Sequence, residues 1–466
     1  MKILLLTTIF FLNLSMTQAA LSELSKEYLN SSFDNEDQRL GLKINQLTKN
    51  QVLESKAWAL SAATLNTDSK LKSSSTFLST QTQTNSHSLE LSKSFFTGTE
   101  FTFSNTYSTY DNDLFPSTNN KGFTQSLSLT QDLWKNFLGR NDDLDRVVAE
   151  KTYNYQDQST RFQIETNLFN FVTDYINVKV ARAIVDLQEL AVKRAQKRLN
   201  LIKRRVKDGL SERVDLYSAR TQELASIEKL KSDTITFDTS VESLSKKLHR
   251  KVQNTEVLSY KLGSSSELEL VAGKIEENNG FIQTKKQIEY LKDVLTQKEN
   301  GLYPTLAFSG TYATNEYKQS GSPISGGTLG NSNNQVSLGL SLTWNIGSYS
   351  EKLQRESSSI SLNRAKMESR QSLLSLKEEE DALGKRLREV DVLIESALER
   401  LDLANKTLQE YNRLYSRGRA TLDQVIRAEE DLISTQVSYV RYLFRRDSYT
   451  SKLAYLHGKL NEAVFK

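Results

Sequence analysis

The chain has 466 residues, with 61 basic and 57 acidic side chains, so its formal net charge is only +4. This near balance gives no electrostatic reason to expect a nucleic-acid partner, because binding to phosphates needs a strongly basic surface. The chain has no cysteine, which excludes disulfides, thiolate metal sites, cysteine nucleophiles and a lipidated N-terminal cysteine.

Residues 1–19 have the pattern of a secretory signal peptide. Lys2 supplies the positive charge, residues 3–14 are mostly apolar, and the stretch Thr17-Gln18-Ala19 offers small residues at the cleavage positions. The apolar stretch is too short to cross a bilayer as a helix, and a retained anchor is the alternative. No later segment approaches ~18 uninterrupted apolar residues, so the exported chain is expected to have no transmembrane helix.

The rest of the chain is predicted as two structural repeats with the same order of elements. Each repeat consists of a helix, a β-hairpin and a long helical hairpin with a glycine at its tip. The tips, Gly209 and Gly418, lie 209 residues apart in the sequence. The predicted segments are a polar N-terminal segment at residues 20–39, a first repeat at 40–256, a linker at 257–273, a second repeat at 274–456 and a C-terminal tail at 457–466.

The two predicted β-hairpins contain strands in which bulky apolar residues alternate with small polar ones. In the last of these strands, for example, Leu338, Leu340 and Leu342 face one way and serine or glycine faces the other. A weaker pair of stretches, at residues 76–83 and 86–93, is a candidate additional ribbon. The four strong strands are expected at about residues 100–110, 122–131, 304–317 and 334–346.

Each β-hairpin is followed by a helical hairpin that is too long for a compact globule. Only three prolines occur in the chain, so long uninterrupted helices are permitted almost everywhere. Apolar residues from Leu383 to Tyr415 are spaced alternately by four and three, which is the seam of a coiled coil. The helical hairpins are predicted at residues 142–249 and 351–456, and a shorter helix opens each repeat at about 40–65 and 274–299.

The alternation within the strands is typical of a transmembrane β-barrel, in which one face meets lipid and the other meets water. A soluble β-sandwich with one buried face is the alternative. Aromatic residues near the strand ends, such as Tyr110, Trp134 and Trp344, favour the membrane. Four strands are too few to close a barrel, since the smallest common barrels need about eight, and an open edge cannot face lipid. Several chains are therefore expected to share one barrel.

The last long helix leads to the same conclusion for the helices. It carries two apolar seams, one through Ile426 and Ile433 and the other through Val425 and Leu432. Two seams on one helix imply neighbours on both sides, as in a closed ring of helices. A β-barrel that continues into a tube of helices would be a conduit across a cell envelope.

With this architecture, the chain resembles the TolC-like outer-membrane factor family, the exit ducts of tripartite efflux pumps and type I secretion systems. The resemblance covers nearly the whole mature chain. The matching residues are Ser128-Leu129-Thr130-Gln131 before the first long helix, Gly209-Leu210 with Asp215 and Ala219 at the first tip, Leu302-Tyr303-Pro304 before the third strand, and Tyr415 with Gly418, Val425 and Ala428 at the second tip.

The resemblance implies a mixed α and β membrane protein that is internally duplicated, with four membrane strands per chain. A homotrimer would join a twelve-stranded transmembrane β-barrel in the outer-membrane lipid to a coiled-coil α-helical barrel, a twelve-helix tunnel in the periplasm. A periplasmic adaptor and an inner-membrane transporter would engage the coiled-coil tips and open them.

The resemblance also implies a gate at the tips. Asp215 and Tyr415 match positions whose side chains link neighbouring coils in the closed state, and a phenol-to-carboxylate hydrogen bond can be exchanged for water on opening. The alternative is that Tyr415 only fills its seam position and Asp215 is solvated. The family positions that line the constriction of the tunnel, one turn past the second tip, are often acidic and are occupied here by Gln424 and Arg427. Arg427 could therefore favour anions, or could be an ordinary surface charge.

Docking of the adaptor is expected to use both tips, at residues 207–210 and 417–421. The residues named for this role are Gly209, Leu210, Arg417, Gly418 and Arg419. This expectation rests on the resemblance alone.

No catalytic pattern is found in the sequence, so no enzyme and no cofactor is expected. The three histidines, His87, His249 and His457, have no metal-ligand spacing. The competing hypothesis is a structural coiled-coil spacer or adhesin in the envelope without a conducting pore. The alternating strands and the paired glycine tips argue against it. The transported substrate cannot be read from a shared, water-filled tunnel.

Overall fold

The computed structural model describes residues 21–70, 82–112, 121–253, 260, 268, 271–319, 323, 333–347 and 349–465. The predicted signal peptide and most of the predicted linker at residues 257–273 lie outside these residues. The chain divides into two compact units, each described here by itself. The helical unit contains residues up to Leu42, Asp157–Thr284 and Glu368–Lys466, and the sheet unit contains Lys43–Gln156 and Lys285–Met367.

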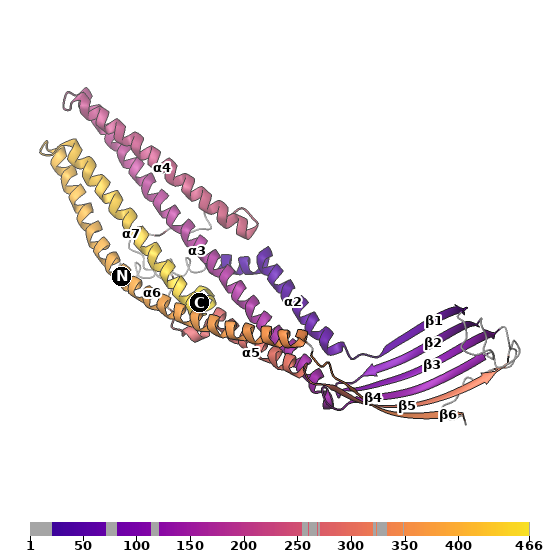
Figure 1. Cartoon of the computed structure of the whole chain (residues 1–466). Coiled ribbons are helices and arrows are strands. Elements are labelled where there is room, and N and C mark those ends of the chain that lie inside the picture. Colours follow the sequence, from indigo (N-terminus) through magenta and orange to yellow (C-terminus); the bar gives the residue numbers. More distant parts are fainter. Residues whose placement is uncertain are drawn as a thin grey trace, which may run out of the picture. The chain divides into compact units, whose positions relative to one another are not determined.

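The described elements are mostly helical, with one antiparallel sheet (Figure 1). The helices are α2 (Phe33–Glu54), α3 (Arg140–Lys207), α4 (Arg213–Leu248), α5 (Asn279–Asn300), α6 (Tyr349–Ser416), α7 (Leu422–Leu456) and α8 (Leu460–Phe465), with short 3-10 turns η1 (Phe137–Gly139) and η2 (Ile275–Glu277). The strands are β1 (Ala59–Ser69), β2 (Thr82–Ser94), β3 (Thr99–Asn112), β4 (Lys121–Asp132), β5 (Thr305–Lys318) and β6 (Asn334–Thr343).

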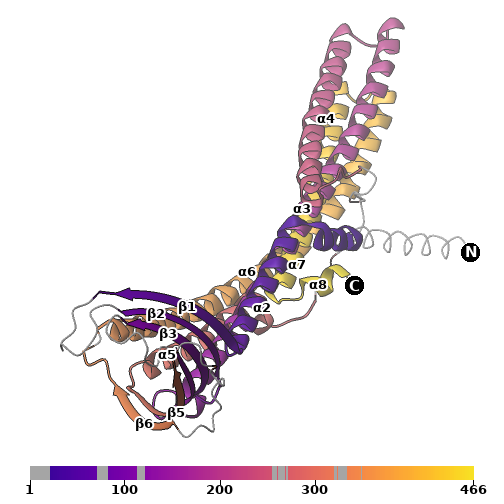
Figure 2. The same cartoon turned by 90° about the vertical axis from the view of Figure 1, so that its right-hand side faces the viewer.

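Apolar clusters set the order of the long helices in the helical unit. Phe171 of α3 packs in one cluster with Phe237 of α4, and Leu187 of α3 packs in another with Val440 of α7. A further cluster contains Leu408 of α6 and residues of α7. The layer therefore runs α4, α3, α7, α6, with α3 and α7 inside (Figures 1 and 2).

The two outer helices of this layer leave apolar side chains exposed. On α6, Leu374, Val392 and Leu403 are exposed and are separated by 18 and 11 residues, close to whole numbers of helical turns. They therefore lie on one face. On α4, Tyr217 and Ile235 are exposed and are likewise five turns apart. Apolar stripes of this kind are expected to be covered by another helix.

The two ends of the described chain pack on the same core, which the sequence did not predict. Residues 21–31, within the predicted polar segment, form a helix. Its buried face includes Tyr28, whose ring stacks on Phe171 with 4.5 Å between centroids. Helix α8, in the predicted tail, buries Leu460 and Val464 in the same cluster. Short apolar stretches become helical here because the packed core covers them, which a local pattern does not reveal.

The sheet has six strands in sequence order, β1 to β6, and every neighbouring pair is antiparallel. The sequence predicts four, with the two hairpins β3–β4 and β5–β6 near their observed bounds. The predicted fourth strand at 334–346 ends earlier, at Thr343, since the chain turns at Gly347 with φ of +82°. The additional strands are β1 and β2, which precede β3.

The extra strands correct two predictions. The helix predicted at residues 40–65 ends at Glu54, and residues 59–69 form β1 instead. Residues 76–81 of the candidate ribbon at 76–83 and 86–93 lie outside the described residues, and the rest of it belongs to one strand, β2, which pairs with β1 across residues 82–92. Alanine and leucine in β1 favour a helix locally, but eleven paired positions with β2 override that preference.

Several elements of the two predicted repeats have equal lengths. Helices α3 and α6 have 68 residues each and begin 209 residues apart, at Arg140 and Tyr349. Helices α2 and α5 have 22 residues each, and strands β3 and β5 have 14 each. In the described part of the chain, no helix combines the length and apolarity needed to span a bilayer.

Candidate gate at the helical tips

The two hairpin tips of the helical unit have the same backbone structure, and both lie at one end of the layer (Figure 1). The Leu210 N–H donates to the Arg205 carbonyl at 2.7 Å, and the Arg419 N–H donates to the Leu414 carbonyl at 2.9 Å. In both, a glycine with positive φ, +70° at Gly209 and +74° at Gly418, precedes that donor. This is the Schellman ending of a helix, which selects glycine because a Cβ is strained at this φ.

Gln424, predicted to line the constriction, also closes the start of α7. The Thr421 N–H donates to the Gln424 Oε1 at 2.9 Å, and the Gln424 N–H donates to the Thr421 Oγ1 at 3.3 Å. This reciprocal pair is a capping box, which satisfies two backbone donors at the helix start. The first hairpin has no such side-chain cap at Glu212. The side chain of Gln424 is therefore occupied within its own chain.

Arg427, the second residue predicted at the constriction, is exposed and paired. Its Nε lies 2.8 Å from the Asp423 Oδ2, one helical turn away, and both side chains are more than half exposed. A pair of this kind contributes little to stability. It does bring a carboxylate beside the guanidinium, so the charge offered by this turn of α7 is close to neutral.

Tyr415 lies where two apolar clusters meet, near the second tip. One cluster contains Leu199 and Leu422, the other contains Leu408 and Val425, and Tyr415 packs against both. The guanidinium of Arg205 stands 4.8 Å above its ring. Within the described residues, the buried Tyr415 hydroxyl has no hydrogen-bond partner. The ring is thus part of the core while its polar end is left unsatisfied, which costs free energy.

Asp215 lies in the first turn of α4, where the helix dipole favours a carboxylate. The next residue, Leu216, packs in the same cluster as Tyr415. The two predicted latch residues are therefore brought to the same region of the helical unit. In this single chain the hydroxyl of Tyr415 does not donate to Asp215, so their role as a latch remains a prediction.

A buried ion cluster below the tips was not predicted. The Arg194 Nε donates to the Glu429 Oε1 at 2.7 Å, and Arg198 pairs with the other carboxylate oxygen of Glu429. Glu429 is only 5% exposed. Burial lowers the pKa of Arg194, and burial together with the nearby Arg194 charge lowers the pKa of Arg198 to about 10. The cluster joins α3 of the first hairpin to α7 of the second.

One sequence signal could have revealed this cluster. Along α7 the seam passes through Leu422, Val425, Leu432 and Tyr439 at spacings of three, seven and seven, and Glu429 occupies the seam position between Val425 and Leu432. A charged residue at a seam position of a coiled coil requires a buried partner. Its partners lie 235 and 231 residues earlier in the sequence, which the pattern cannot identify.

The ion cluster and the predicted latch residue line the same cavity. This cavity of about 250 Å³ is bordered by Arg194, Arg198 and Glu429 on one side and by Leu408 and Tyr415 on the other. The unsatisfied hydroxyl of Tyr415 and the spare N–H groups of both arginines, which also have no partner among the described residues, are therefore close together.

The outer surface of the tips is formed by the residues predicted for adaptor docking. Leu210 is 70% exposed, and Arg417, Gly418 and Arg419 are exposed as well. An apolar side chain on one tip and two cations on the other thus face outward. Among the described residues, no group of histidine and acidic side chains has the arrangement of a metal site.

Neither protein-family models nor curated proteins give a match to this chain. Solved structures do. The outer membrane protein VceC of Vibrio cholerae matches with a TM-score of 0.70 and 14% identity, over 94% of this chain and 96% of that one. The Campylobacter jejuni outer membrane channel CmeC matches with a TM-score of 0.70 and 9% identity, over 95% of this chain and 86% of that one. The open-state Neisseria gonorrhoeae outer membrane channel MtrE matches with a TM-score of 0.69 and 11% identity, over 94% of this chain and 89% of that one. At these identities the likeness establishes the fold, and it confirms the expected TolC-like channel fold.

Proposed function

We propose that this chain, which has the fold of TolC-like outer-membrane channels, is one subunit of a homotrimeric outer-membrane channel with a long periplasmic extension. The channel would be the exit duct of a tripartite efflux pump or a type I secretion system. It would bind partners and let substrates pass without chemistry of its own.

The observation that carries this proposal is that each unit has two outer elements whose outward sides are not covered by the rest of the described chain. In the helical unit, the outer helices α4 and α6 have exposed apolar stripes. In the sheet unit, the outer strands β1 and β6 have no neighbouring strand on one side within the described part of the chain. Copies of the chain around a threefold axis would cover the stripe on α4 with that on α6. Such a ring explains both features, whereas a coiled-coil spacer or adhesin would cover the helical stripes but would leave the strand edges unpaired.

The exposed residues of the tips support the proposed partners of the channel. The exposed Leu210 and the cations Arg417 and Arg419 are available to a periplasmic adaptor, which would connect the channel to an inner-membrane transporter. The two faces of the sheet suit a barrel in lipid. One face carries residues such as Leu127, Leu129 and Leu338, and the other carries mainly serine and threonine.

The proposal is tested by the conductance of the purified trimer in a planar lipid bilayer, and the same experiment tests the latch. We expect discrete single-channel conductance from the unaltered protein. Tyr415→Phe combined with Asp215→Ala should raise it, because each hydrogen bond lost from the closed tip shifts the closed-to-open equilibrium about tenfold. Tyr411→Phe, at the preceding seam position, is the matched control and should leave conductance unchanged.

Two results would count against these assignments. Electrical silence from correctly assembled trimers would exclude a conducting duct. Equal conductance of the double variant, the control and the unaltered channel would remove Asp215 and Tyr415 from the gate.

A further inference from the structure

The β1–β2 hairpin is an integral part of the sheet rather than an appendage. Strand β2 pairs with β1 along one side over eleven positions and with β3 along the other over thirteen. Strand β3 in turn pairs with β4 over eleven positions. Both sides of β3 are therefore used within the chain. Among the described strands, only β1 and β6 keep a free side at which another strand could pair.

A comparison of the two halves of the chain identifies this hairpin as an insertion. In the second half, four residues connect the end of α5 at Asn300 to the start of β5 at Thr305. In the first half, 44 residues connect the end of α2 at Glu54 to the start of β3 at Thr99. The helices and strands that flank the two connections have equal lengths. The difference of forty residues therefore corresponds to β1, β2 and their turns.

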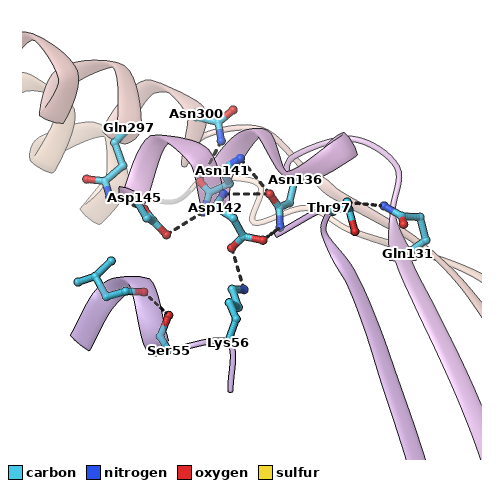
Figure 3. Close-up of polar contacts among 11 residues, drawn as sticks. Ser55, Lys56, Thr97, Gln131, Asn136, Asn141, Asp142, Asp145, Gln297 and Asn300 are labelled. Atoms are coloured by element: carbon cyan, nitrogen blue, oxygen red, sulfur yellow. Dashed lines mark hydrogen bonds and ion pairs between the residues drawn. The ribbon is translucent and has the colours of Figure 1, made fainter. Parts of the chain in front are cut away.

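The inserted hairpin is fixed to the base of the sheet at both of its ends (Figure 3). At its start, the Lys56 Nζ lies 2.9 Å from the Asp142 Oδ1, and Asp142 is a buried residue in the first turn of α3. At its end, the Gln131 Nε2 donates to the Thr97 carbonyl at 3.1 Å. Asn136 also donates to Asp142 and completes the cluster. These contacts hold β1 and β2 in line with the other four strands.

The two free edges lack the features that prevent strands from pairing. Natural edge strands are commonly interrupted by proline, lysine or a bulge. Strand β6 contains no charged residue and no proline, and β1 contains a single charge, Asp68, next to its end. Nearly all residues of both strands are exposed in the single chain. Edges of this kind would be an aggregation hazard unless another strand covered them.

The register shows that β1 and β2 extend both faces of the sheet. Leu60 of β1 is opposite Leu91 of β2, which is opposite Phe103 of β3, which is opposite Leu127 of β4. This apolar row thus reaches the edge at β1 without a break. The neighbouring row on the other face begins at Ala59 of β1 and continues through Ser92, Thr102 and Ser128, which are all small. At this end of the sheet, the inserted hairpin therefore continues the apolar face and the small-residue face of the other strands.

We propose that β1 of one chain pairs with β6 of the next, so that the trimer closes a barrel of eighteen strands, six from each chain, instead of twelve. This inference rests on the proposed function. The directions agree, because an even number of alternating strands places β1 antiparallel to the neighbouring β6. Since barrel diameter grows roughly linearly with strand number, the lumen would be about 1.5 times as wide as that of twelve strands.

The absence of cysteine allows a direct test by crosslinking in the intact membrane protein. Ala63→Cys on the small-residue face of β1 is combined in turn with Gln335→Cys, Ser337→Cys or Ser341→Cys on the same face of β6. At least one combination should be linked on oxidation into covalent dimers and trimers, because opposed residues of paired strands bring their Cβ atoms within about 5 Å. The control combines the same β6 variants with Ser104→Cys on β3, and no intermolecular link should form.

A barrel of twelve strands would give the opposite pattern, with links from β3 to β6 and none from β1, and that result would overturn the proposal. A second variant removes dependence on the choice of positions. Residues 55–98 are replaced by Gly-Leu-Tyr-Pro, the sequence that joins α5 to β5. In this shortened chain β3 becomes an edge, so Ser104→Cys should now link to β6.

The lumen width is measured separately with polyethylene glycols of graded size added on the barrel side of a bilayer. The unaltered channel should admit larger polymers than the shortened one, and an equal size limit would contradict the eighteen-stranded barrel.

Two outcomes distinguish this inference from the proposed function. A conducting channel with β3–β6 links would overturn this inference and leave the proposed function standing. Links from β1 to β6 in an assembly that never conducts would support the closed barrel and contradict the duct.

Discussion

Glu429→Ala is expected to loosen the helical tips more than any other single change near them. The variant removes the carboxylate that both guanidinium groups share and leaves Arg194, 30% exposed, and Arg198, 11% exposed, side by side without a counter-charge. Removing one partner of a buried ion cluster costs about 3–5 kcal/mol, because the remaining charges lose their compensation. Amide hydrogen exchange along residues 190–202 and 422–436 should therefore become at least about a hundredfold faster.

The matched control is the neighbouring carboxylate. Glu430 follows Glu429 in α7 but is exposed, so Glu430→Ala should change the same exchange rates little. A third variant separates charge from packing. Replacing Arg194, Arg198 and Glu429 together by Met, Met and Leu removes every charge of the cluster, and its cost should be far smaller than that of Glu429→Ala. Similar exchange rates in the Glu429→Ala and Glu430→Ala variants would show that the cluster does not hold the two hairpins together.

The position of the ion cluster determines which opening motion of the tip would break it. It connects α3 to α7 inside one chain, while the exposed stripes on α4 and α6 face outward. The connection between the two hairpins of a chain is therefore charged and buried, whereas the contact proposed between chains is apolar. An opening motion that separates chains would leave the cluster intact, and one that separates the hairpins of a chain would break it.

The long helices and their tips could be predicted closely because their signals are local. A run of alternating three and four spacings defines the seam before Tyr415, and a glycine with positive φ ends the helix in both halves. Strands β3 to β6 were similarly visible as alternating patterns. In each case the decisive information lies within one segment of the chain.

The missed features depend on contacts between distant segments. Strand β1 reads as the continuation of a helix until its pairing with β2 is known. The helix at residues 21–31 is short and is stabilised by Phe171 and by α8, which comes from the far end of the chain. Local patterns identify the long helices and the strongly alternating strands, and they specify long-range strand pairing and side-chain partners poorly.

Gly139→Ala is expected to disrupt the base of the sheet. Gly139 has φ of +81°, and a Cβ at this position would lie 1.5 Å from the Phe96 carbonyl oxygen and 3.1 Å from the Thr97 Cα. Both obstacles are backbone atoms in the turn between β2 and β3, so neither can rotate away. The variant should lose about 4 kcal/mol or more of stability, seen as a large fall in the melting temperature of the detergent-purified protein.

Gly347→Ala is a closely matched control for this effect. Gly347 has φ of +82° and lies in the connection from β6 to α6, as Gly139 lies in the connection from β4 to α3. No atom of the described chain lies within 4 Å of the position that its Cβ would take. Its alanine variant should therefore show only the left-handed strain, about 1–2 kcal/mol. Equal destabilisation by the two variants would contradict the clash, whereas a larger loss at Gly139 would show that the turn after β2 is held against the start of α3.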